Sequence, residues 1–247
     1  NSLIKAIIFL ALIRAKIYQK ILKHFAKRIN TKIAVSFKVK EIFTKNGFKN
    51  LKVINNPIII SPSDRTIREN KIIYIGKLSK GKGVDLLFSS LPQVFKQTTA
   101  AEIEIVGSGH LMDSLKNQAK VTRLSSKIRF IGHVSHEEAI KKLRQASLAI
   151  VPSIWPEPLP RAIIESILCQ TPVVATDVGG NSEIIKDDIY GKICEPNANL
   201  LARAIIKTWQ KRKEFNKNLS ADFQILRKKY SEDVCDSYEK IYNLSLK

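Results

Sequence analysis

The chain has 247 residues, of which 44% are hydrophobic and 26% are charged, a composition typical of a soluble globular protein with a full hydrophobic core. Its net charge is +20, and residues 1–70 alone hold 15 Lys and Arg against 3 Asp and Glu. This excess predicts an anionic partner. Because no zinc-finger spacing or RNA-binding aromatic signature accompanies it, a membrane surface or a phosphorylated ligand is favoured over nucleic acid. The cysteines, Cys169, Cys194 and Cys235, are too scattered for a disulfide framework or a metal site and indicate a reducing, cytoplasmic compartment.

The first predicted element is a basic amphipathic helix over residues 2–29, which holds seven basic residues and no acidic one. Apolar side chains recur at steps of three and four from Leu3 to Phe25. The uninterrupted apolar run, residues 6–13, is far shorter than the about 20 residues that span a bilayer, and no signal-peptide cleavage site follows it. We expect this helix to pack on a sheet, and direct contact with anionic lipid is the alternative. The opposite, polar face carries Lys16, Lys20, Lys23 and Lys27.

Eight short apolar runs predict buried strands, and helix-length segments separate most of them. Strand and helix in alternation predict an α/β fold with a Rossmann-like parallel sheet that carries helices on both faces. Pro57 and Pro62 interrupt the rhythm, so we place a linker at residues 59–70, between a first unit (1–58) and a self-contained domain (71–228). Ser231 is the expected N-cap of a terminal helix within residues 229–247. The predicted strands are residues 32–36, 51–54, 71–76, 102–107, 127–132, 147–153, 172–176 and 191–194.

The turn GKLSKGKG, residues 76–83, follows a predicted strand and precedes a helix. It nearly matches a P-loop, but Gly83 stands where a P-loop needs Ser or Thr to hold magnesium, which disfavours a P-loop NTPase. Glycine amides, a helix N-terminus and the two lysines Lys77 and Lys82 still predict a diphosphate site. An ordinary surface turn with solvated lysines is the alternative.

Two further turns follow predicted strands. In VGSGHLM, Gly107 and Gly109 suit close backbone approach to a ligand, but Met112 replaces the third glycine of the dinucleotide fingerprint, which disfavours a dehydrogenase. In IGHVSHEE, Ser135 is the expected N-cap of the next helix, with Glu138 closing a capping box. His133 either stacks on a base or is an exposed loop histidine.

The segment EPLPRAIIE places two carboxylates around a short apolar run. We expect Pro160 at the first helical position, so that Glu157 lies in the loop before the helix and Glu165 about one turn inside it. Both carboxylates would then face the carboxyl end of the preceding strand, where open α/β sheets bind ligands. Two solvated surface charges are the alternative.

Taken in order and spacing, these segments resemble the donor-binding half of the retaining glycosyltransferases of family 4, which have the GT-B architecture of two facing Rossmann-like domains. GKLSKGKG, VGSGHL, IRFIGHVSHEEAIKKL and VPSIWPEPLPRAIIESILCQTPVVATDVGGNSEII carry the resemblance, which runs from Lys71 to the end of the chain. AVSFKVKEIFTKNGFKNLKVINNPI is more weakly similar to the close of the first, acceptor-binding domain. The resemblance therefore implies that most of the N-terminal acceptor domain is truncated here.

The resemblance also implies a role for each matched residue. Glu157 would contact the donor sugar near its reacting face, and Glu165 would hold the ribose hydroxyls. Lys77, where the family usually has Arg, and Lys82 would neutralise the diphosphate leaving group. Pro160 replaces a common Gly and lacks an N–H, and Gln170 stands where a Gly usually ends the helix. The remaining donor-binding positions are Gly76 and Gly107 in the turns, His133 near the base, and Leu159, Pro160, Arg161 and Ala162, where backbone amides grip sugar hydroxyls and phosphate.

The implied function is transfer of a sugar from a nucleotide-diphosphate-sugar donor to a glycan or lipid-linked acceptor, with retention of anomeric configuration. No Asp-x-Asp pair occurs in the chain, so we expect no metal and no cofactor, with lysines neutralising the leaving group. We expect the chain alone to bind donor weakly and to transfer nothing. The alternatives are a non-catalytic nucleotide-sugar binding module and the donor subunit of a two-chain transferase. The expected location is the cytoplasm, with peripheral contact at the inner membrane face as a hypothesis.

Overall fold

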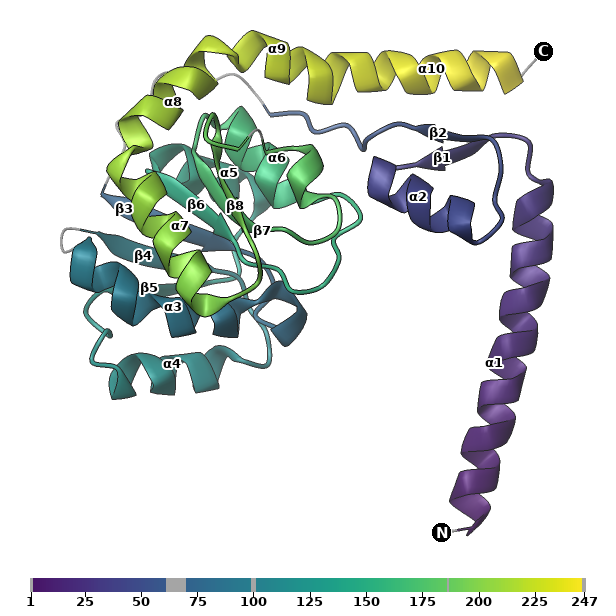
Figure 1. Ribbon diagram of the computed structural model, residues 1–247, viewed down its shortest axis with the longest axis horizontal. Helices are drawn as coiled ribbons and strands as arrows, with labels where there is room; N and C mark the ends of the chain where they lie inside the picture. The colour runs from purple at the N-terminus through teal and green to yellow at the C-terminus, as the bar shows by residue number, and fades with distance from the viewer. Residues whose placement is uncertain (1, 61–69, 99–100, 186, 246–247) are drawn as a thin grey trace.

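The computed structural model describes residues 2–60, 70–98, 101–185 and 187–245, with side chains from residue 14 to residue 243 within these ranges (Figure 1). Two parallel sheets form the frame. The smaller sheet pairs β1 (Lys32–Ala34) with β2 (Leu51–Val53), and α2 (Phe37–Lys45) connects them. Most of the predicted linker, residues 61–69, lies outside the described residues.

The larger sheet has six parallel strands in the order β5-β4-β3-β6-β7-β8. The chain passes from β3 outward through β4 to β5 and then returns to the other side of β3 with β6. The order therefore reverses between β3 and β6, and such a switch point opens a crevice at the carboxyl ends of the two strands. The strands are β3 (Lys71–Ile75), β4 (Glu102–Val106), β5 (Ile128–Gly132), β6 (Leu148–Val151), β7 (Val173–Thr176) and β8 (Gly191–Cys194).

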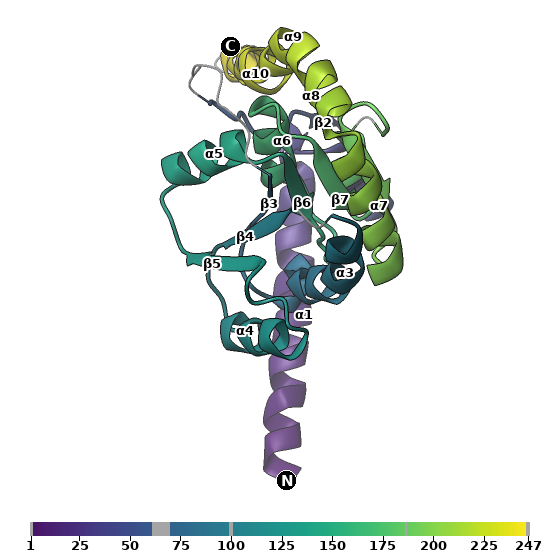
Figure 2. The ribbon, with the colours of Figure 1, turned by 90° about the vertical axis from the view of Figure 1, so that its left-hand side faces the viewer.

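Helices cover both faces of this sheet, as the alternation of strands and helices predicts (Figure 2). Successive residues of β3 show the two faces, because Ile72 and Tyr74 belong to one buried cluster and Ile73 to another. The first cluster includes α3 (Val84–Gln97), α4 (Met112–Val121) and α7 (Ala198–Gln210). The second includes α5 (His136–Gln145) and α6 (Arg161–Leu168).

The last helices carry the chain from the larger sheet back to the smaller one (Figure 1). Val234 and Ile241 of the terminal helix form a buried cluster with Ile54, next to β2. Ser231 is not the N-cap that the sequence predicts, since it lies inside a π-helical turn that continues directly into the terminal helix. A π-turn keeps the backbone helical, and here it buries Tyr230 at 2% exposure. The elements are α8 (Arg212–Ala221), α9 (Phe223–Arg227), the π-helix Lys228–Glu232 and α10 (Asp233–Ser245).

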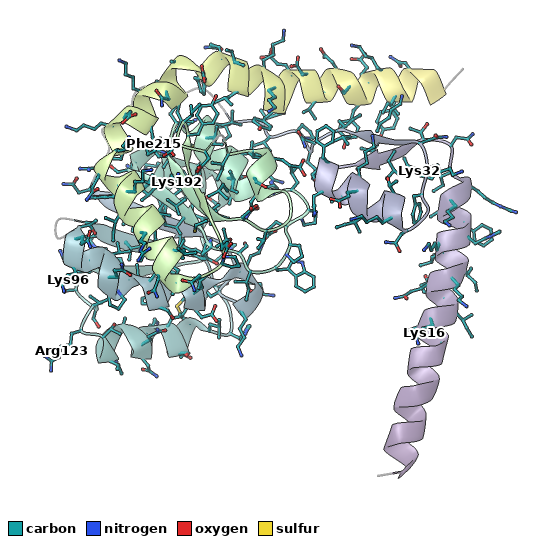
Figure 3. The ribbon with its side chains drawn as sticks, viewed as in Figure 1. Lys16, Lys32, Lys96, Arg123, Lys192 and Phe215 are labelled. Carbon is teal, nitrogen blue, oxygen red and sulfur yellow. The ribbon has the colours of Figure 1, made fainter. Side chains whose placement is uncertain are left out.

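Helix α1 (Ser2–Arg28) projects away from both sheets (Figures 1 and 3). Among its described side chains, Ile17 and Phe25 are 54% and 61% exposed, so the expected packing on a sheet is absent from the described structure. Lys23 reaches Asn46 at 3.4 Å and so links the described part of this helix to the end of α2. Among the described residues, none of the helices combines the length and the apolar character that crossing a bilayer requires.

Candidate functional site

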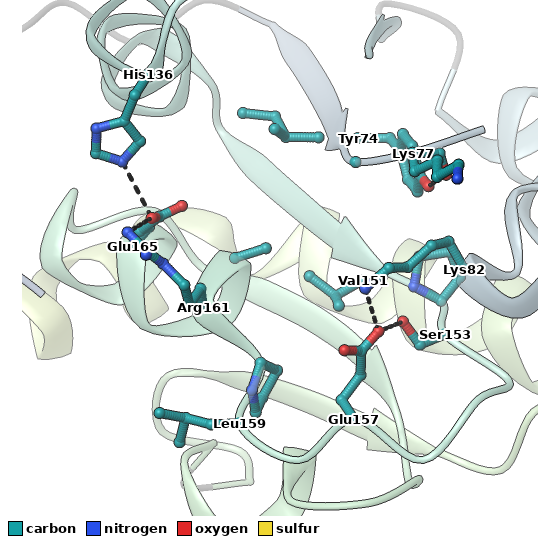
Figure 4. Close-up of a pocket in the computed structure, with 15 residues that line it drawn as sticks. Tyr74, Lys77, Lys82, His136, Val151, Ser153, Glu157, Leu159, Arg161 and Glu165 are labelled. Carbon is teal, nitrogen blue, oxygen red and sulfur yellow. Dashed lines mark hydrogen bonds and ion pairs between the residues drawn. The ribbon is translucent and has the colours of Figure 1, made fainter. Parts of the chain in front are cut away.

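A cavity of about 640 Å³ opens at the carboxyl ends of β3 and β6, at the switch point of the sheet (Figure 4). It brings together nine of the eleven residues predicted for the site: Gly76, Lys77, Lys82, Glu157, Leu159, Pro160, Arg161, Ala162 and Glu165. Six further residues line it: Tyr74, Ile75, His136, Val151, Pro152 and Ser153. Strand ends, a glycine turn and the start of α6 therefore converge on one cavity that holds charged side chains.

The lysine-bearing turn forms one wall. A short 3₁₀ helix (Lys80–Lys82) ends at Gly83, whose φ of 65° is left-handed. A Cβ atom at Gly83 would lie 1.7 Å from the carbonyl oxygen of Pro152, so no side chain fits there. This packing explains why Ser or Thr is absent and further disfavours the P-loop interpretation. The Lys77 side chain forms no ion pair with any carboxylate that the structure describes, which leaves its ammonium available to an anion.

Glu157 lies opposite this wall, with its side chain 13% exposed. Its Oε1 accepts hydrogen bonds from Lys82 Nζ at 2.5 Å and from Ser153 Oγ at 2.9 Å (Figure 4). Its backbone is held from behind, because the N–H of Gly180 donates to the Glu157 carbonyl at 2.9 Å. The carboxylate is thus fixed in the lining of the cavity and already holds one of the two predicted phosphate-binding lysines.

Tyr74 is buried beneath the lysine turn at 2% exposure and donates from its hydroxyl to the Lys77 carbonyl at 2.9 Å. Burial, with a smaller contribution from the charge of Glu157, holds the pKa of the phenol well above its ordinary value. The neutral phenol therefore anchors the backbone of Lys77. Its position inside a strand gave no sequence signal for a site residue.

Glu165 lies deep on α6, with its side chain 12% exposed. Its Oε1 accepts from Arg161 Nη2 at 3.3 Å and lies 3.1 Å from His136 Nε2, at the start of α5. Pro160 is the N-cap of α6, one residue before its predicted place, because its ψ of 89° is not helical. Glu165 still falls about one turn inside the helix and faces the cavity, as predicted.

Two predicted residues do not line the cavity. His133 is exposed on the loop after β5, whereas His136, three residues later, reaches the cavity. Gly107 has a φ of 133°, and a Cβ atom there would lie 1.9 Å from the carbonyl oxygen of Gly76. Gly107 therefore supports the lysine turn from behind. The Ser135 cap, whose Oγ accepts from the Glu138 N–H at 3.2 Å, is the signal that could have identified His136, since it starts the helix at that residue.

The chain belongs to the family of glycosyl transferases group 1, whose model matches residues 58–222. It is 27% identical over 183 residues to an uncharacterized glycosyltransferase of Methanocaldococcus jannaschii, and this match covers 72% of this chain and 46% of the relative. It is also 31% identical over 126 residues to a glycogen synthase of Mycobacterium tuberculosis, and this match covers 51% of this chain and 30% of the relative. The chain thus spans half or less of the length of these two relatives.

Solved structures show the same fold. TarM of S. aureus, in complex with fondaparinux, alpha-GlcNAc-glycerol and UDP, superposes with a TM-score of 0.80 at 23% identity over 91% of this chain and 46% of its own. Anabaena HepE, in complex with UDP and glucose, superposes with a TM-score of 0.77 at 22% identity over 91% of this chain and 65% of its own. These likenesses confirm the expected GT-B type of α/β fold.

Proposed function

We propose that this chain carries the donor half of a glycosyltransferase that moves a sugar from a nucleotide-diphosphate-sugar to a glycan or lipid-linked acceptor. The observation that carries the proposal is the cavity itself, in which two lysines and two carboxylates meet at the switch point of the sheet. Family membership and relatives solved with UDP support it. We also propose retention of configuration and independence from metal, which rest on the resemblance of the site motifs.

The charges of the cavity fit this chemistry. Breaking a bond between a sugar and a diphosphate builds an oxocarbenium-like centre and frees negative charge on the leaving oxygens. Lys77 and Lys82 lie on the turn that would face those oxygens and would stabilise the developing charge. Glu157 would face the sugar, and Glu165 would accept from the ribose hydroxyls. Arg161 and His136 already hold Glu165 in place for that contact. Gly107 would act on the donor only through Gly76, and a role for His133 at the base requires the exposed loop after β5 to fold over the ligand.

A second candidate is a nucleotide-sugar binding module, or a donor subunit that pairs with a separate acceptor chain. The cavity favours it as much as the first candidate, because all the lining residues belong to the predicted donor domain, residues 71–228. We propose residues 1–58 as the end of an acceptor domain, 59–70 as the linker and 229–247 as the returning helix.

Calorimetric titration of the chain with UDP-, GDP- and ADP-sugars, with and without EDTA, tests the proposal. We expect weak binding of one of these donors that EDTA does not change. Absence of binding to all of them, or strict dependence on magnesium, would contradict the proposed function. Transfer assays with a supplied acceptor chain separate an enzyme from a binding module.

We further propose peripheral contact of α1 with an anionic membrane, at the cytoplasmic face. The helix carries no acidic residue, and its large apolar side chains from Ile17 to Phe25 are exposed beside the lysines. Replacing Lys16, Lys20, Lys23 and Lys27 by Gln should abolish co-sedimentation with vesicles that contain phosphatidylserine. Replacing four lysines outside α1 (Lys96, Lys116, Lys120 and Lys213) is the matched control, and equal binding of both variants would reject the contact.

A further inference from the structure

Helix α2 begins at Phe37, and its first amides are bonded to a residue 146 positions further along the chain. Glu183 Oε2 accepts from the Phe37 N–H at 2.8 Å, and Glu183 Oε1 accepts from the Lys38 N–H at 2.7 Å. Ser36 Oγ accepts from the next amide, that of Val39, at 3.2 Å. The amides that open the helix thus all have side-chain acceptors, and Glu183 supplies two of them.

The contact is also electrostatic. The N-terminus of a helix carries a partial positive charge, and the first turn of α2 contains no acidic residue of its own. The Glu183 carboxylate supplies the missing negative charge from the other unit of the chain. A bidentate, charge-assisted cap of this kind is stronger than the bond that either oxygen makes alone.

Hydrogen bonds within a short segment after β7 hold Glu183 in place. It ends a 3₁₀ turn (Asn181–Glu183), in which its N–H donates to the Gly180 carbonyl at 3.2 Å. Asn181 is fully buried and donates from Nδ2 to the Thr176 carbonyl at 2.8 Å, at the end of β7. The carboxylate is therefore tied to the larger sheet through a short, bonded segment.

The turn before Glu183 contacts residues of both parts of the chain, Glu157 near the cavity and Ser36 before α2. The Gly180 N–H donates to the Glu157 carbonyl at 2.9 Å, and a Cβ atom at Gly179 would lie 2.3 Å from that same oxygen. A Cβ atom at Gly180 would lie 3.5 Å from the Ser36 side chain, at the start of α2. One turn thus contacts the backbone of Glu157 and the cap of α2.

We propose that Glu183 is a latch between the two units of the chain and a positioning residue for Glu157. By capping α2, Glu183 holds the smaller unit (β1, α2 and β2) against the Gly179–Gly180 turn. This turn then fixes the backbone of Glu157 at the cavity. The latch goes beyond the proposed function and holds whether or not the cavity binds a nucleotide sugar.

Hydrogen exchange followed by mass spectrometry on the ligand-free, full 247-residue chain tests the latch. In the variant Glu183→Ala we expect the amides of α2 to exchange about tenfold faster, the effect of losing a helix cap. Exchange in residues 177–185, which contain the Gly180 amide, should rise with it. Glu183→Gln keeps one acceptor oxygen and should give an intermediate rate. Glu214→Ala, on α8, is the matched control and should change neither segment.

Each outcome decides the inference. Unchanged exchange in α2 of Glu183→Ala would overturn the latch, whereas faster exchange in α2 with an unchanged segment 177–185 would overturn the positioning of Glu157. Faster exchange in β3, β4 and β6 of Glu183→Ala would mean general unfolding, and Glu183→Gln would then decide. An intermediate exchange rate in α2 of Glu183→Gln would support the latch, and a wild-type rate there would overturn it. Failure of nucleotide binding in the separate titration would leave the latch intact and remove only the proposed function.

Discussion

Glu157 and Glu165 are equally buried carboxylates with different partners. Glu157 holds a lysine that a diphosphate would also attract, while Glu165 holds Arg161 and His136 at the other side of the cavity. A diphosphate that enters the cavity would therefore compete with Glu157 for Lys82 and would meet Lys77, which pairs with no carboxylate in the described part of the chain. This competition makes the two glutamates distinguishable by binding alone.

Replacing Glu157 by Gln should strengthen the binding of UDP, which lacks a sugar. The change frees Lys82, and since this lysine is 42% exposed, the release is worth only a few-fold in affinity, about 2- to 5-fold. Calorimetry at low and high salt is the measurement, and the gain should shrink at high salt. Weaker UDP binding in Glu157→Gln would show that the carboxylate contacts the nucleotide itself.

Replacing Glu165 by Ala should weaken UDP binding by about 10- to 100-fold, because hydrogen bonds from the ribose to a charged group are lost. Titration with UDP measures this loss. Glu137→Ala, an exposed carboxylate on the neighbouring helix α5, is the control. Equal affinity of Glu165→Ala and the wild-type chain would remove Glu165 from the nucleotide site.

At the scale of single elements, the lysine turn depends on a glycine that cannot be replaced. Gly83→Ala should destabilise the chain by clearly more than about 1–2 kcal/mol, the cost of a left-handed conformation alone, because the added Cβ also collides with Pro152. Gly132→Ala is the matched control, since Gly132 has a φ of 83° but nothing within 4 Å of the added Cβ. Urea unfolding measures both variants. Equal destabilisation of the two would mean that the turn moves aside without cost.

Helix α5 is tied to the sheet by a buried ion triad. Glu104 on β4 is 4% exposed and accepts from Lys71 Nζ at 2.9 Å and Lys142 Nζ at 3.2 Å. Burial by itself raises the pKa of Glu104, but the hydrogen bonds and charges of the two lysines outweigh it and hold the pKa below its ordinary value of 4.5. The stabilisation is therefore present above pH 4.5 and is lost as the pH falls through the lowered pKa.

Glu104→Gln should lower the free energy of unfolding at pH 7 by about 3–5 kcal/mol, because two buried lysines lose their counter-charge. The difference from the wild-type chain should shrink below pH 4.5, where the wild-type carboxyl becomes protonated. Urea unfolding at pH 7, 5 and 3 measures it, with Glu102→Gln, a more exposed carboxylate on the same strand, as control. A constant difference across this range would contradict the role of the Glu104 charge.

These elements also show what the sequence could predict. The strands follow from uninterrupted apolar runs, and the edge of the sheet at which the cavity opens follows from the turns after them. Lys77, Lys82, Glu157 and Glu165 therefore lie together at that edge. Tyr74 could not be found, because a strand tyrosine is ordinarily a core residue. Choosing His136 over His133 requires the path of the loop between β5 and α5, which apolar periodicity does not encode. Gln170 has a φ of 57°, so the left-handed end of α6 that a Gly usually makes is kept without one.

At the scale of the whole molecule, a polar contact and an apolar contact help to join the smaller unit, formed by β1, α2 and β2, to the rest of the chain. One is the polar cap that Glu183 places on α2, and the other is apolar, where α10 returns to cover β2. The π-helical turn that buries Tyr230 directs α10 toward that unit, and the Ile58 N–H donates to the Tyr230 carbonyl at 3.0 Å. The segments around Ile58 and Tyr230, through which the chain leaves and returns to the smaller unit, are therefore hydrogen-bonded to each other.

The apolar contact should be the larger of the two. Ile241→Ala removes buried methyl groups between α10 and Ile54, which costs about 2–5 kcal/mol at a packed site. Because the cluster serves only the smaller unit, we expect faster hydrogen exchange in residues 32–54 with unchanged exchange in the six-stranded sheet. Tyr242→Ala, 66% exposed on the same helix, is the control. Combining Ile241→Ala with Glu183→Ala tests cooperation: if both contacts seat one rigid unit, the loss in the double variant will differ from the sum of the single losses, whereas strict additivity would mean that α2 and β2 move separately.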